Sequence, residues 1–399
     1  MNSSPPDYAA RLHRLAARGR LRTLTPLHGR DGCSVAAQGQ RLMNLSSNDY
    51  LGLGGNATLL REFYAAMNEN NALDAYAPGA LSSRLLTGDS EAAQALERSL
   101  ADSYQAEAAL LFNSGYHANI GILPALYGKG DLILSDKLNH ASIHDGLRLA
   151  AAAHKRYRHG DYANLRQLLQ RHRADFRRAV IVSESVFSMD GDFADLAELI
   201  AIKRQFAAEL YLDEAHAVGL YGATGLGWAE ARACLGEIDF LLGTFGKACA
   251  STGAFLICSE EIRRMLINHS RSLIFTTAMP PVSVTWNRFI WAKLRQYTSA
   301  RAHLMRIAQA LRDSLRQHGL ATHGESNIVP VLLGDAQLTI QVAESLRNQG
   351  YLALPVRPPT VPEGTSRLRL SLTAAMQWDD LKNVPTAICR AIAIAPKGT

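Results

Sequence analysis

The 399-residue sequence has few cysteines and no long apolar run. Its five cysteines are odd in number and widely spaced, so they predict neither a disulfide framework nor a zinc site, and we expect no bound metal. No stretch approaches the roughly eighteen uncharged apolar residues that a membrane span needs. Residues 1–20 lack the apolar core of a signal peptide. We therefore expect a protein of the reducing cytoplasm that does not associate with a membrane.

A concentrated block of one charge is also missing. The net charge is only +6, and the lysines and arginines are scattered instead of forming an arm that could bind nucleic acid. A modest positive field suits an anionic small molecule or an acidic carrier protein equally well. The composition, with 47% hydrophobic and 20% charged residues, is that of an ordinary folded protein.

What the chain does contain is an alternation of short apolar runs with helical stretches, which is typical of a mostly parallel sheet covered by helices. One such helical stretch, 196–208, lies directly before a strand candidate. The predicted strands are 132–134, 179–182, 210–212, 240–242 and 255–257.

The pattern changes around Pro280-Pro281. A single long helix is predicted over 284–318, followed by further short strands and helices of a smaller α+β domain. These later elements are a strand at 328–333, a helix at 339–348, a proline-rich loop at 355–362, a strand at 368–372 and a last helix. Residues 7–22 predict an amphipathic helix. The resulting division is an N-terminal helix and arm over 1–55, a large α/β domain over 56–282 and a small C-terminal domain over 283–399.

Polar side chains are concentrated directly after four of the predicted strands. Ligands of open α/β sheets bind beyond the carboxyl ends of the strands, so these side chains should share one site. They are His140 after the first strand, the segment Ser183–Asp192 after the second, Asp213, Glu214 and His216 after the third, and Thr244 and Lys247 after the fourth.

These residue types could serve one cofactor. A carboxylate can pair with a protonated ring nitrogen, and a desolvated lysine can act as an amine nucleophile. The segment Asn113–His117 predicts a helix start whose N–H groups could hold a phosphate, with Thr244 adding a hydroxyl. Taken alone, Lys247 would more often be a surface residue, Asp213 a helix cap and His140 a packed histidine. Their occurrence together favours the functional interpretation.

Two other motifs were weighed. Leu-Asp-Glu-Ala-His at 212–216 is spelled like a helicase acidic box, but a helicase needs a phosphate loop GxxxxGK[ST]. Before Gly246-Lys247 the position of the first glycine is Leu241, and Ala248 replaces the magnesium-binding hydroxyl, so this interpretation fails. Gly225-Leu-Gly227 begins like a dinucleotide fingerprint, but no strand leads into it, and a loop is predicted.

Several segments together resemble the α-oxoamine synthases. These are pyridoxal phosphate (PLP) enzymes of fold type I, which is aspartate aminotransferase-like, with a mostly parallel central sheet and a smaller C-terminal α+β domain. Within this family, 357–362, 367–373 and Ser83 look most like the biotin-pathway member, which condenses L-alanine with a pimeloyl thioester. The matching segments are 44–53, 83–88, 136–142, 184–191, 213–219, 244–247, 274–277 and 367–369.

The resemblance implies a role for each matching residue. For catalysis it implies that Lys247 carries PLP as a Schiff base and moves the proton at the substrate Cα. It also implies that Asp213 pairs with the ring nitrogen and that His140 stacks on the ring. His216 and Ser188 are implied to bind the ring hydroxyl. For the phosphate it implies Ser114, Gly115, Tyr116 and Thr244, with Thr277 reaching in from a second subunit. For the substrates it implies Arg369 and Asn48 at the amino-acid carboxylate, Ser83 beside the alanine methyl group, and Arg22 at the acyl chain.

The implied reaction is a decarboxylative condensation of an amino acid with a coenzyme A or carrier-protein thioester, in a homodimer with shared active sites. Three departures from the family pattern leave the substrates open: residues 76–82 replace a glycine-rich run, Ala250 replaces a glycine, and Met376 stands where a histidine often sits. Alternatives are glycine, serine or a different acyl chain in a specialised pathway. A silent paralogue that supports an active partner subunit is a third.

Overall fold

The computed structural model describes residues 7–395, which form two compact units. The large unit comprises Asn48–Ser188 and Asp192–His303. The small unit comprises the described residues up to Ser47, the short segment Met189–Gly191 and the residues from Leu304 onward. The three-part division at 55/56 and 282/283 stays a prediction about domains, and residues 1–6 and 396–399, which it includes, lie outside the described part.

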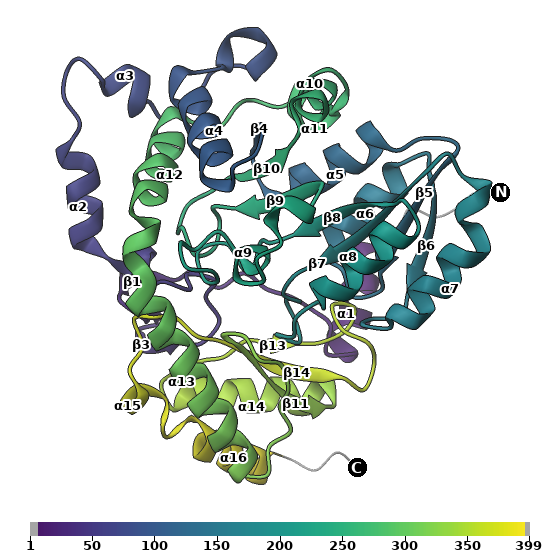
Figure 1. Cartoon of the computed structure of the whole chain (residues 1–399). Coiled ribbons are helices and arrows are strands. Elements are labelled where there is room, and N and C mark those ends of the chain that lie inside the picture. Colours follow the sequence, from purple (N-terminus) through teal and green to yellow (C-terminus); the bar gives the residue numbers. More distant parts are fainter. Residues whose placement is uncertain (1–6, 396–399) are drawn as a thin grey trace. The chain divides into compact units, whose positions relative to one another are not determined.

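The large unit is built on a seven-stranded sheet with the order β4-β10-β9-β8-β7-β5-β6 (Figure 1). Neighbouring strands pair in parallel except β10, which is antiparallel to both β4 and β9. The mostly parallel sheet is therefore confirmed. The strands are β4 (Ala108–Phe112), β5 (Asp131–Asp136), β6 (Ala153–Tyr157), β7 (Arg178–Glu184), β8 (Glu209–Asp213), β9 (Phe240–Thr244) and β10 (Ala254–Cys258).

All five predicted strands lie inside observed ones, and two strands were missed. Strand β4 has the sequence Ala-Ala-Leu-Leu-Phe, which continues the apolar pattern of the preceding helix α4 (Glu91–Tyr104). Strand β6 is Ala-His-Lys-Arg-Tyr, and its three polar side chains are exposed because it is the last strand of the sheet. Charged edge strands are common since they discourage pairing with other chains, but they carry no apolar signal.

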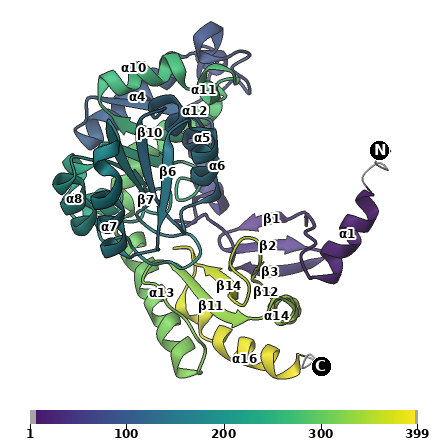
Figure 2. The same cartoon turned by 90° about the vertical axis from the view of Figure 1, so that its right-hand side faces the viewer.

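Helices cover both faces of this sheet (Figure 2). On one face α5 (Gly115–Leu126), α6 (Ala141–Leu149), α10 (Glu260–His269) and α11 (Arg271–Ile274) pack into one apolar cluster with the strands. On the other face lie α7 (Tyr162–His172) and α8 (Leu196–Gln205). Further helices of this unit are α2 (Ala57–Ala65), α3 (Ala72–Ala75), α9 (Trp228–Ala231) and α12 (Pro281–Lys293).

The single long helix predicted over 284–318 is wrong. Helix α12 ends at Lys293, a 3₁₀ turn spans Leu294–Tyr297, and α13 runs over Thr298–Gln317. The buried Arg301 explains the interruption, because its guanidinium donates to the carbonyl of Leu294 at 2.9 Å and to that of Ala223 at 2.9 Å. The Arg301 side chain thus takes the place of a backbone N–H as hydrogen-bond partner of the Leu294 carbonyl, at the end of α12.

The small unit contains two smaller sheets. One has the order β1-β2-β3-β12 and buries Val35, Leu42 and Leu352, and the other has the order β11-β14-β13. The predicted helix over 7–22 is shorter, and ends before Gly19, whose φ is +61°. The elements are α1 (Tyr8–Ala17), β1 (His28–Asp31), β2 (Ser34–Ala37), β3 (Gln40–Asn44), β11 (Ile328–Gly334), α14 (Ala336–Asn348), β12 (Tyr351–Leu352), β13 (Pro355–Val356), β14 (Ser366–Ser371), α15 (Trp378–Leu381) and α16 (Val384–Ile394).

Within residues 7–395, every helix is too short or too polar to span a bilayer.

Candidate active site

A cavity of about 160 Å³ opens at the carboxyl edge of the large sheet. All of its lining residues belong to the large unit, and seven of them are predicted site residues. Those seven are Gly115, Tyr116, His140, Asp213, His216, Thr244 and Lys247, and the cavity adds Asn119, Ser142, Glu184 and Ala215. The strand ends therefore bring together the groups that the sequence placed after them.

Lys247 reaches this cavity from the turn after β9. The Thr244 hydroxyl donates to the carbonyl of Gly253 at 2.9 Å and accepts from the N–H of Gly246 at 3.1 Å, which fixes the turn just before the lysine. The lysine itself is half-buried. Three residues on, Ala250 has φ +50°, a left-handed conformation in which glycine carries less strain.

Asp213 is buried at the end of β8, and both of its carboxylate oxygens are held. Oδ2 accepts from Asn119 Nδ2 at 3.0 Å, and Oδ1 accepts from the N–H of Ala215 at 2.9 Å. Asn119 is itself oriented by Tyr211, whose hydroxyl donates to Asn119 Oδ1 at 2.7 Å. The carboxylate therefore has a fixed direction before any ligand binds.

His140 caps helix α6 through its own ring. Nδ1 accepts from the N–H of Ser142 at 3.2 Å and lies 2.7 Å from the Ser142 hydroxyl. Because a backbone N–H only donates, a neutral His140 carries its proton on Nε2. Burial lowers the pKa of His140; the charge of Asp213 opposes this effect, and that of Lys247 adds to it. The ring is thus neutral at physiological pH.

His216 is buried and is linked to a residue of the predicted substrate site. Its Nδ1 lies 2.7 Å from the Tyr50 hydroxyl, which donates to Asn48 Oδ1 at 3.1 Å. Since the single hydroxyl proton goes to Asn48, His216 Nδ1 donates to the Tyr50 oxygen. Asn48 is therefore tied to the cavity through Tyr50, which the sequence did not single out.

The start of helix α5 is the segment that the sequence predicts to hold a phosphate. Ser114 is the N-cap, and its hydroxyl accepts from the N–H of His117 at 3.1 Å. The first N–H groups of a helix have no partner within the helix, and they attract anions. At Gly115 an added Cβ would meet no heavy atom within 4 Å, so the backbone is open on that side.

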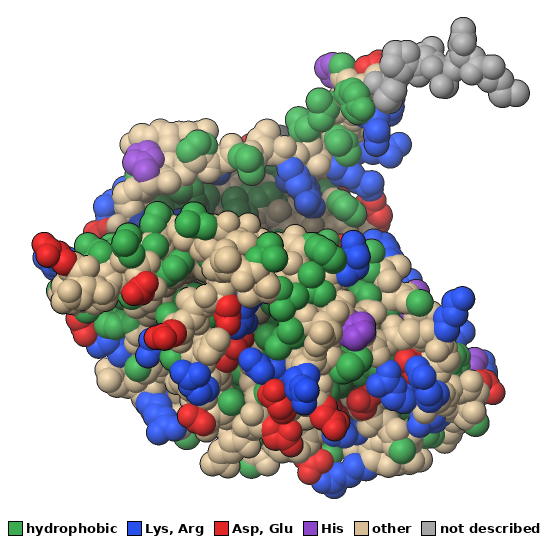
Figure 3. Space-filling view, turned by 90° about the horizontal axis from the view of Figure 1, so that it is seen from above, with side chains coloured by type: hydrophobic (Ala, Val, Ile, Leu, Met, Phe, Trp, Pro, Cys, Tyr) green, Lys and Arg blue, Asp and Glu red, His purple; other side chains and the backbone are tan. Residues whose placement is uncertain are grey.

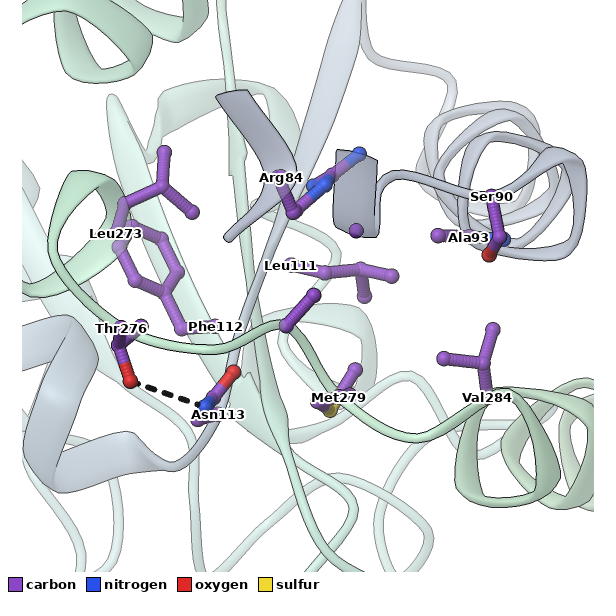
Figure 4. A pocket seen from close by; sticks show the side chains of 12 residues that line it. Arg84, Ser90, Ala93, Leu111, Phe112, Asn113, Leu273, Thr276, Met279 and Val284 are labelled. Atoms are coloured by element: carbon purple, nitrogen blue, oxygen red, sulfur yellow. Dashed lines mark hydrogen bonds between the residues drawn. The ribbon is translucent and has the colours of Figure 1, made fainter. Parts of the chain in front are cut away.

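A second, much smaller cavity of about 20 Å³ lies between the turn Arg84–Gly88, strand β4 and the segment before α12 (Figure 4). At its edge Asn113 Nδ2 donates to the carbonyl of Thr277 at 2.7 Å and lies 3.4 Å from Thr276 Oγ1. Ser83 precedes the turn, and its carbonyl accepts from the N–H of Gly88 at 2.9 Å. Neither Thr277 nor Ser83 belongs to the lining of the Lys247 cavity of the same chain.

Glu184 lies in the segment that the sequence placed at this site, but no role was predicted for it. It is 2% exposed at the end of β7, directly opposite Asp213 in the strand register. Among the described residues its Oε1 has no hydrogen-bond partner. Burial raises the pKa of Glu184 well above its usual range, and the neighbouring Asp213 adds to the effect. The positive charge of Lys247 acts against this rise.

The remaining predicted residues lie outside the cavity lining. Ser188 is buried in the loop after β7. Arg22 and Arg369 belong to the small unit, where Arg22 donates to Thr360 Oγ1 at 2.7 Å and Arg369 lies on β14. The roles of all these residues remain proposals.

The cavity fits PLP by the chemistry of its side chains. It offers a helix start for a phosphate, an oriented carboxylate for a ring nitrogen and an amine for the aldehyde, all from one unit. In the described part of the chain, no three His, Cys, Asp or Glu side chains are grouped as a metal site requires.

Comparison with known proteins agrees with this chemistry. The family model for aminotransferases of class I and II matches residues 40–388. The 8-amino-7-oxononanoate synthase of Chlorobaculum parvum is 50% identical over 368 residues, which cover 92% of this chain and 94% of the relative. That of Haemophilus ducreyi is 47% identical over 382 residues, covering 94% and 98%.

Solved structures give the same family. Serine palmitoyltransferase of Sphingomonas wittichii superposes with a TM-score of 0.88 at 30% identity, covering 97% of both chains. The 8-amino-7-oxononanoate synthase of Francisella tularensis superposes with a TM-score of 0.74 at 26% identity, covering 88% of this chain and 98% of the other. The chain belongs to the α-oxoamine synthases, PLP-dependent enzymes of fold type I.

Proposed function

We propose that the protein is an 8-amino-7-oxononanoate synthase, which joins the Cα of L-alanine to the acyl carbon of a pimeloyl thioester and releases carbon dioxide and free thiol. The observation that carries the proposal is the single cavity shared by Lys247, Asp213, His140 and His216. The curated relatives, at 47–50% identity over nearly the whole chain, carry this name.

The cavity residues divide the work at the cofactor. PLP, when bound, supplies an electron sink for the charge left at Cα when a proton is removed. Lys247 is the amine that lines the cavity, so we assign to its Nζ both the attachment of the cofactor and the movement of the Cα proton. Asp213, fixed by Asn119 and the Ala215 N–H, holds a proton on the ring nitrogen. The neutral His140 also lines the cavity and would bring no charge to the cofactor ring.

Two arginines of the small unit are suited to a carboxylate at the end of the acyl chain. Burial and the neighbouring Arg22 lower the pKa of Arg357. Its Nε has no hydrogen-bond partner among the described residues, while its Nη2 donates to the carbonyl of Leu21 at 2.6 Å. Two guanidinium groups so close to each other repel unless an anion joins them. The free carboxylate of a pimeloyl chain is such an anion, and this favours a dicarboxylic acyl donor.

A basic pocket of about 310 Å³ on the large unit supports a thioester with phosphate groups. His144, Arg148, His154 and Arg156 line it, and burial together with the two arginines lowers the pKa of His144. Its one acid, Asp145, is engaged by the Tyr116 hydroxyl at 2.7 Å and by Arg148 at 2.8 Å. Coenzyme A and a carrier protein both carry phosphopantetheine, so the pocket fits either donor.

A homodimer is supported by large apolar side chains that are exposed on the large unit. Leu73, Leu81, Leu86 and Phe275 are 69–93% exposed, and Phe275 lies two residues before Thr277. Figure 3 shows several exposed hydrophobic side chains on one face of the molecule, interspersed with other side chains. Large exposed apolar side chains of this kind suit an interface, here with a second copy that contributes Thr277 to the shared site. Such an enzyme would work in the cytoplasm.

The test is product formation from defined substrates. Purified protein incubated with L-alanine and pimeloyl-coenzyme A, or pimeloyl-carrier protein, should give 8-amino-7-oxononanoate by mass spectrometry and should rescue a biotin-requiring strain. Product with glycine, serine or another acyl chain only would support the specialised-pathway alternative. A protein that binds PLP but forms no product with any donor would be the silent paralogue.

A further inference from the structure

His159 lies just after the edge strand β6, outside the cavity lining. Both nitrogens of its ring contact carboxylates: Nδ1 lies 3.0 Å from Asp136 Oδ1, and Nε2 lies 2.8 Å from Asp192 Oδ2. Ionised carboxylates only accept hydrogen bonds, so this geometry requires a proton on each ring nitrogen. Partial burial lowers the pKa of His159, but the bonds to the two carboxylates outweigh it and raise the pKa to about 10.

The first carboxylate belongs to the loop that carries His140. Asp136 is the last residue of β5, is 2% exposed and lies four residues before His140. Its Oδ1 also accepts from the N–H of Leu138 at 2.8 Å, and its Oδ2 accepts from the N–H of Gly160 at 3.3 Å. Asp136 thus shapes the loop and at the same time ties it to His159.

The second carboxylate belongs to the loop that carries Ser188. In this loop the N–H of Phe187 donates to the carbonyl of Asp192 at 3.0 Å, which joins the two residues. The ring of Phe187 packs edge-on against the ring of His159, with centroids 4.4 Å apart. His159 therefore holds this loop both by a hydrogen bond and by packing against the residue next to Ser188.

We propose that His159 is a positioning residue, whose bridge between Asp136 and Asp192 fixes the His140 loop relative to the Ser188 loop. The inference rests on the proposed function, because that function places His140 and Ser188 at the cofactor ring. His159 lies outside the cavity lining and acts through these two loops. Second-layer contacts of this kind keep reacting groups in their productive geometry.

Two variants break one half of the bridge each. The amide nitrogen of Asn matches the position of Nδ1, so His159→Asn keeps the bond to Asp136 and releases Asp192. The amide nitrogen of Gln matches Nε2, so His159→Gln keeps Asp192 and releases Asp136. His269→Gln, at an exposed histidine in the last turn of α10, is the matched control.

The readout is the visible absorption and circular dichroism of bound PLP across pH, measured beside kcat and KM. Releasing Asp192 frees the loop that carries Ser188, which under the proposed function binds the ring hydroxyl. The pH at the midpoint of the absorption change of bound PLP should therefore shift by about half a pH unit. Releasing Asp136 should change the circular dichroism, since His140 sets the asymmetry of the ring environment. In both variants kcat should fall roughly 10- to 100-fold with little change in the KM for alanine.

Asp192→Ala removes the acceptor of the same contact from the more exposed side. Combined with His159→Asn it should add no further spectral shift, because both changes remove one interaction. If all three variants keep the spectra and kcat of the parent while only the melting temperature falls, His159 is a structural residue and the proposal is wrong. If the parent protein itself binds no PLP, the proposed function has failed, which is a different result.

Discussion

The large and the small unit contribute different kinds of chemistry. In the cavity of the large unit the Asp213 carboxylate is held by neighbours of the same unit, Asn119 and the Ala215 N–H. In the small unit, Arg22 and Arg357 repel each other, and Arg357 Nε has no hydrogen-bond partner among residues 7–395. Under the proposed function, the large unit holds the cofactor with oriented groups, whereas the small unit leaves positive charge that the acyl substrate would neutralise. Cofactor chemistry and acyl-chain recognition should therefore be separable by mutation.

The largest effect is expected at Lys247. Lys247→Ala should lower kcat by at least roughly 1,000-fold, because one amine performs both nucleophilic and acid–base steps. Borohydride should fix PLP to the parent protein at this residue, as peptide mass spectrometry can show, and should fix none in the variant. Lys382→Ala, at an exposed lysine of the small unit, is the control and should behave like the parent. Covalent attachment that survives in Lys247→Ala contradicts the assignment.

Arg357→Gln should distinguish most clearly between acyl-chain recognition in the small unit and cofactor binding in the large unit. Loss of a charged hydrogen-bond donor to the terminal carboxylate should raise the KM for a pimeloyl thioester about 10- to 100-fold. The spectrum of bound PLP should stay that of the parent. The matched substrate control is a heptanoyl thioester, which lacks the carboxylate and should respond little to the change. Equal losses with both substrates would mean that Arg357 does not meet the carboxylate.

The two arginines of the basic pocket should give smaller effects. Arg148→Gln and Arg156→Gln should each raise the KM for the thioester about 2- to 5-fold and leave kcat unchanged, since partly exposed charges contribute up to about 1 kcal/mol. The difference from the parent should shrink as salt is added. Steady-state kinetics with coenzyme A and carrier-protein thioesters would show which donor depends on the pocket. A salt-independent loss of kcat would point to a structural role instead.

The bridge at His159 predicts a pH-dependent stability. Burial lowers the pKa of His159, but the two carboxylates outweigh it and raise the pKa from 6.5 to about 10. The contribution of the bridge to the free energy of unfolding is therefore complete below about pH 6.5 and is lost as the pH rises through about 10. His159→Gln should therefore melt roughly 2–4 °C below the parent near pH 6, and the gap should narrow near pH 10.5. Calorimetry of both proteins across this range checks the sign, and a gap that widens with pH would contradict it.

Ala250→Gly should have the smallest effect, and it should stabilise the protein instead of impairing it. Ala250 holds a left-handed backbone, so glycine should stabilise the fold by up to about 1 kcal/mol. Leu81→Gly is a parallel case, because Leu81 has φ +62° in the segment that replaces a glycine-rich run of the family. A lower melting temperature in Ala250→Gly would show that the methyl group contributes more by packing than it costs in strain.

Much of the site could be predicted because strand ends are local features of the sequence. Asp213 and Glu214 show the limit of that reasoning: both follow β8, but Asp213 lines the cavity, whereas Glu214 accepts from the N–H groups of Trp228 and Ala229. Burial raises the pKa of Glu214 to about 7. The two residues differ only in the direction in which their side chains point. Beyond the end of a strand the sequence pattern does not predict that direction.

Other features could not be predicted because they depend on distant partners. Asn119 orients Asp213 across 94 residues of chain, and nothing in its helix distinguishes it from a packing residue. The break between α12 and α13 depends on Arg301 and its contact with Ala223. Strand β6 was missed because an exposed edge strand has no apolar alternation. The periodic segments predicted the mostly parallel sheet correctly, and fold type I followed from the family resemblance.

The cap of helix α6 has a consequence for the proton balance of cofactor loading. The N–H of Ser142 fixes His140 as the neutral ring protonated on Nε2. Stacking of PLP on this ring should therefore neither take up nor release a proton there. Titration calorimetry of the apoprotein in two buffers of different ionisation enthalpy would count the protons exchanged. His140→Phe, which has no ionisable ring, should leave that count unchanged.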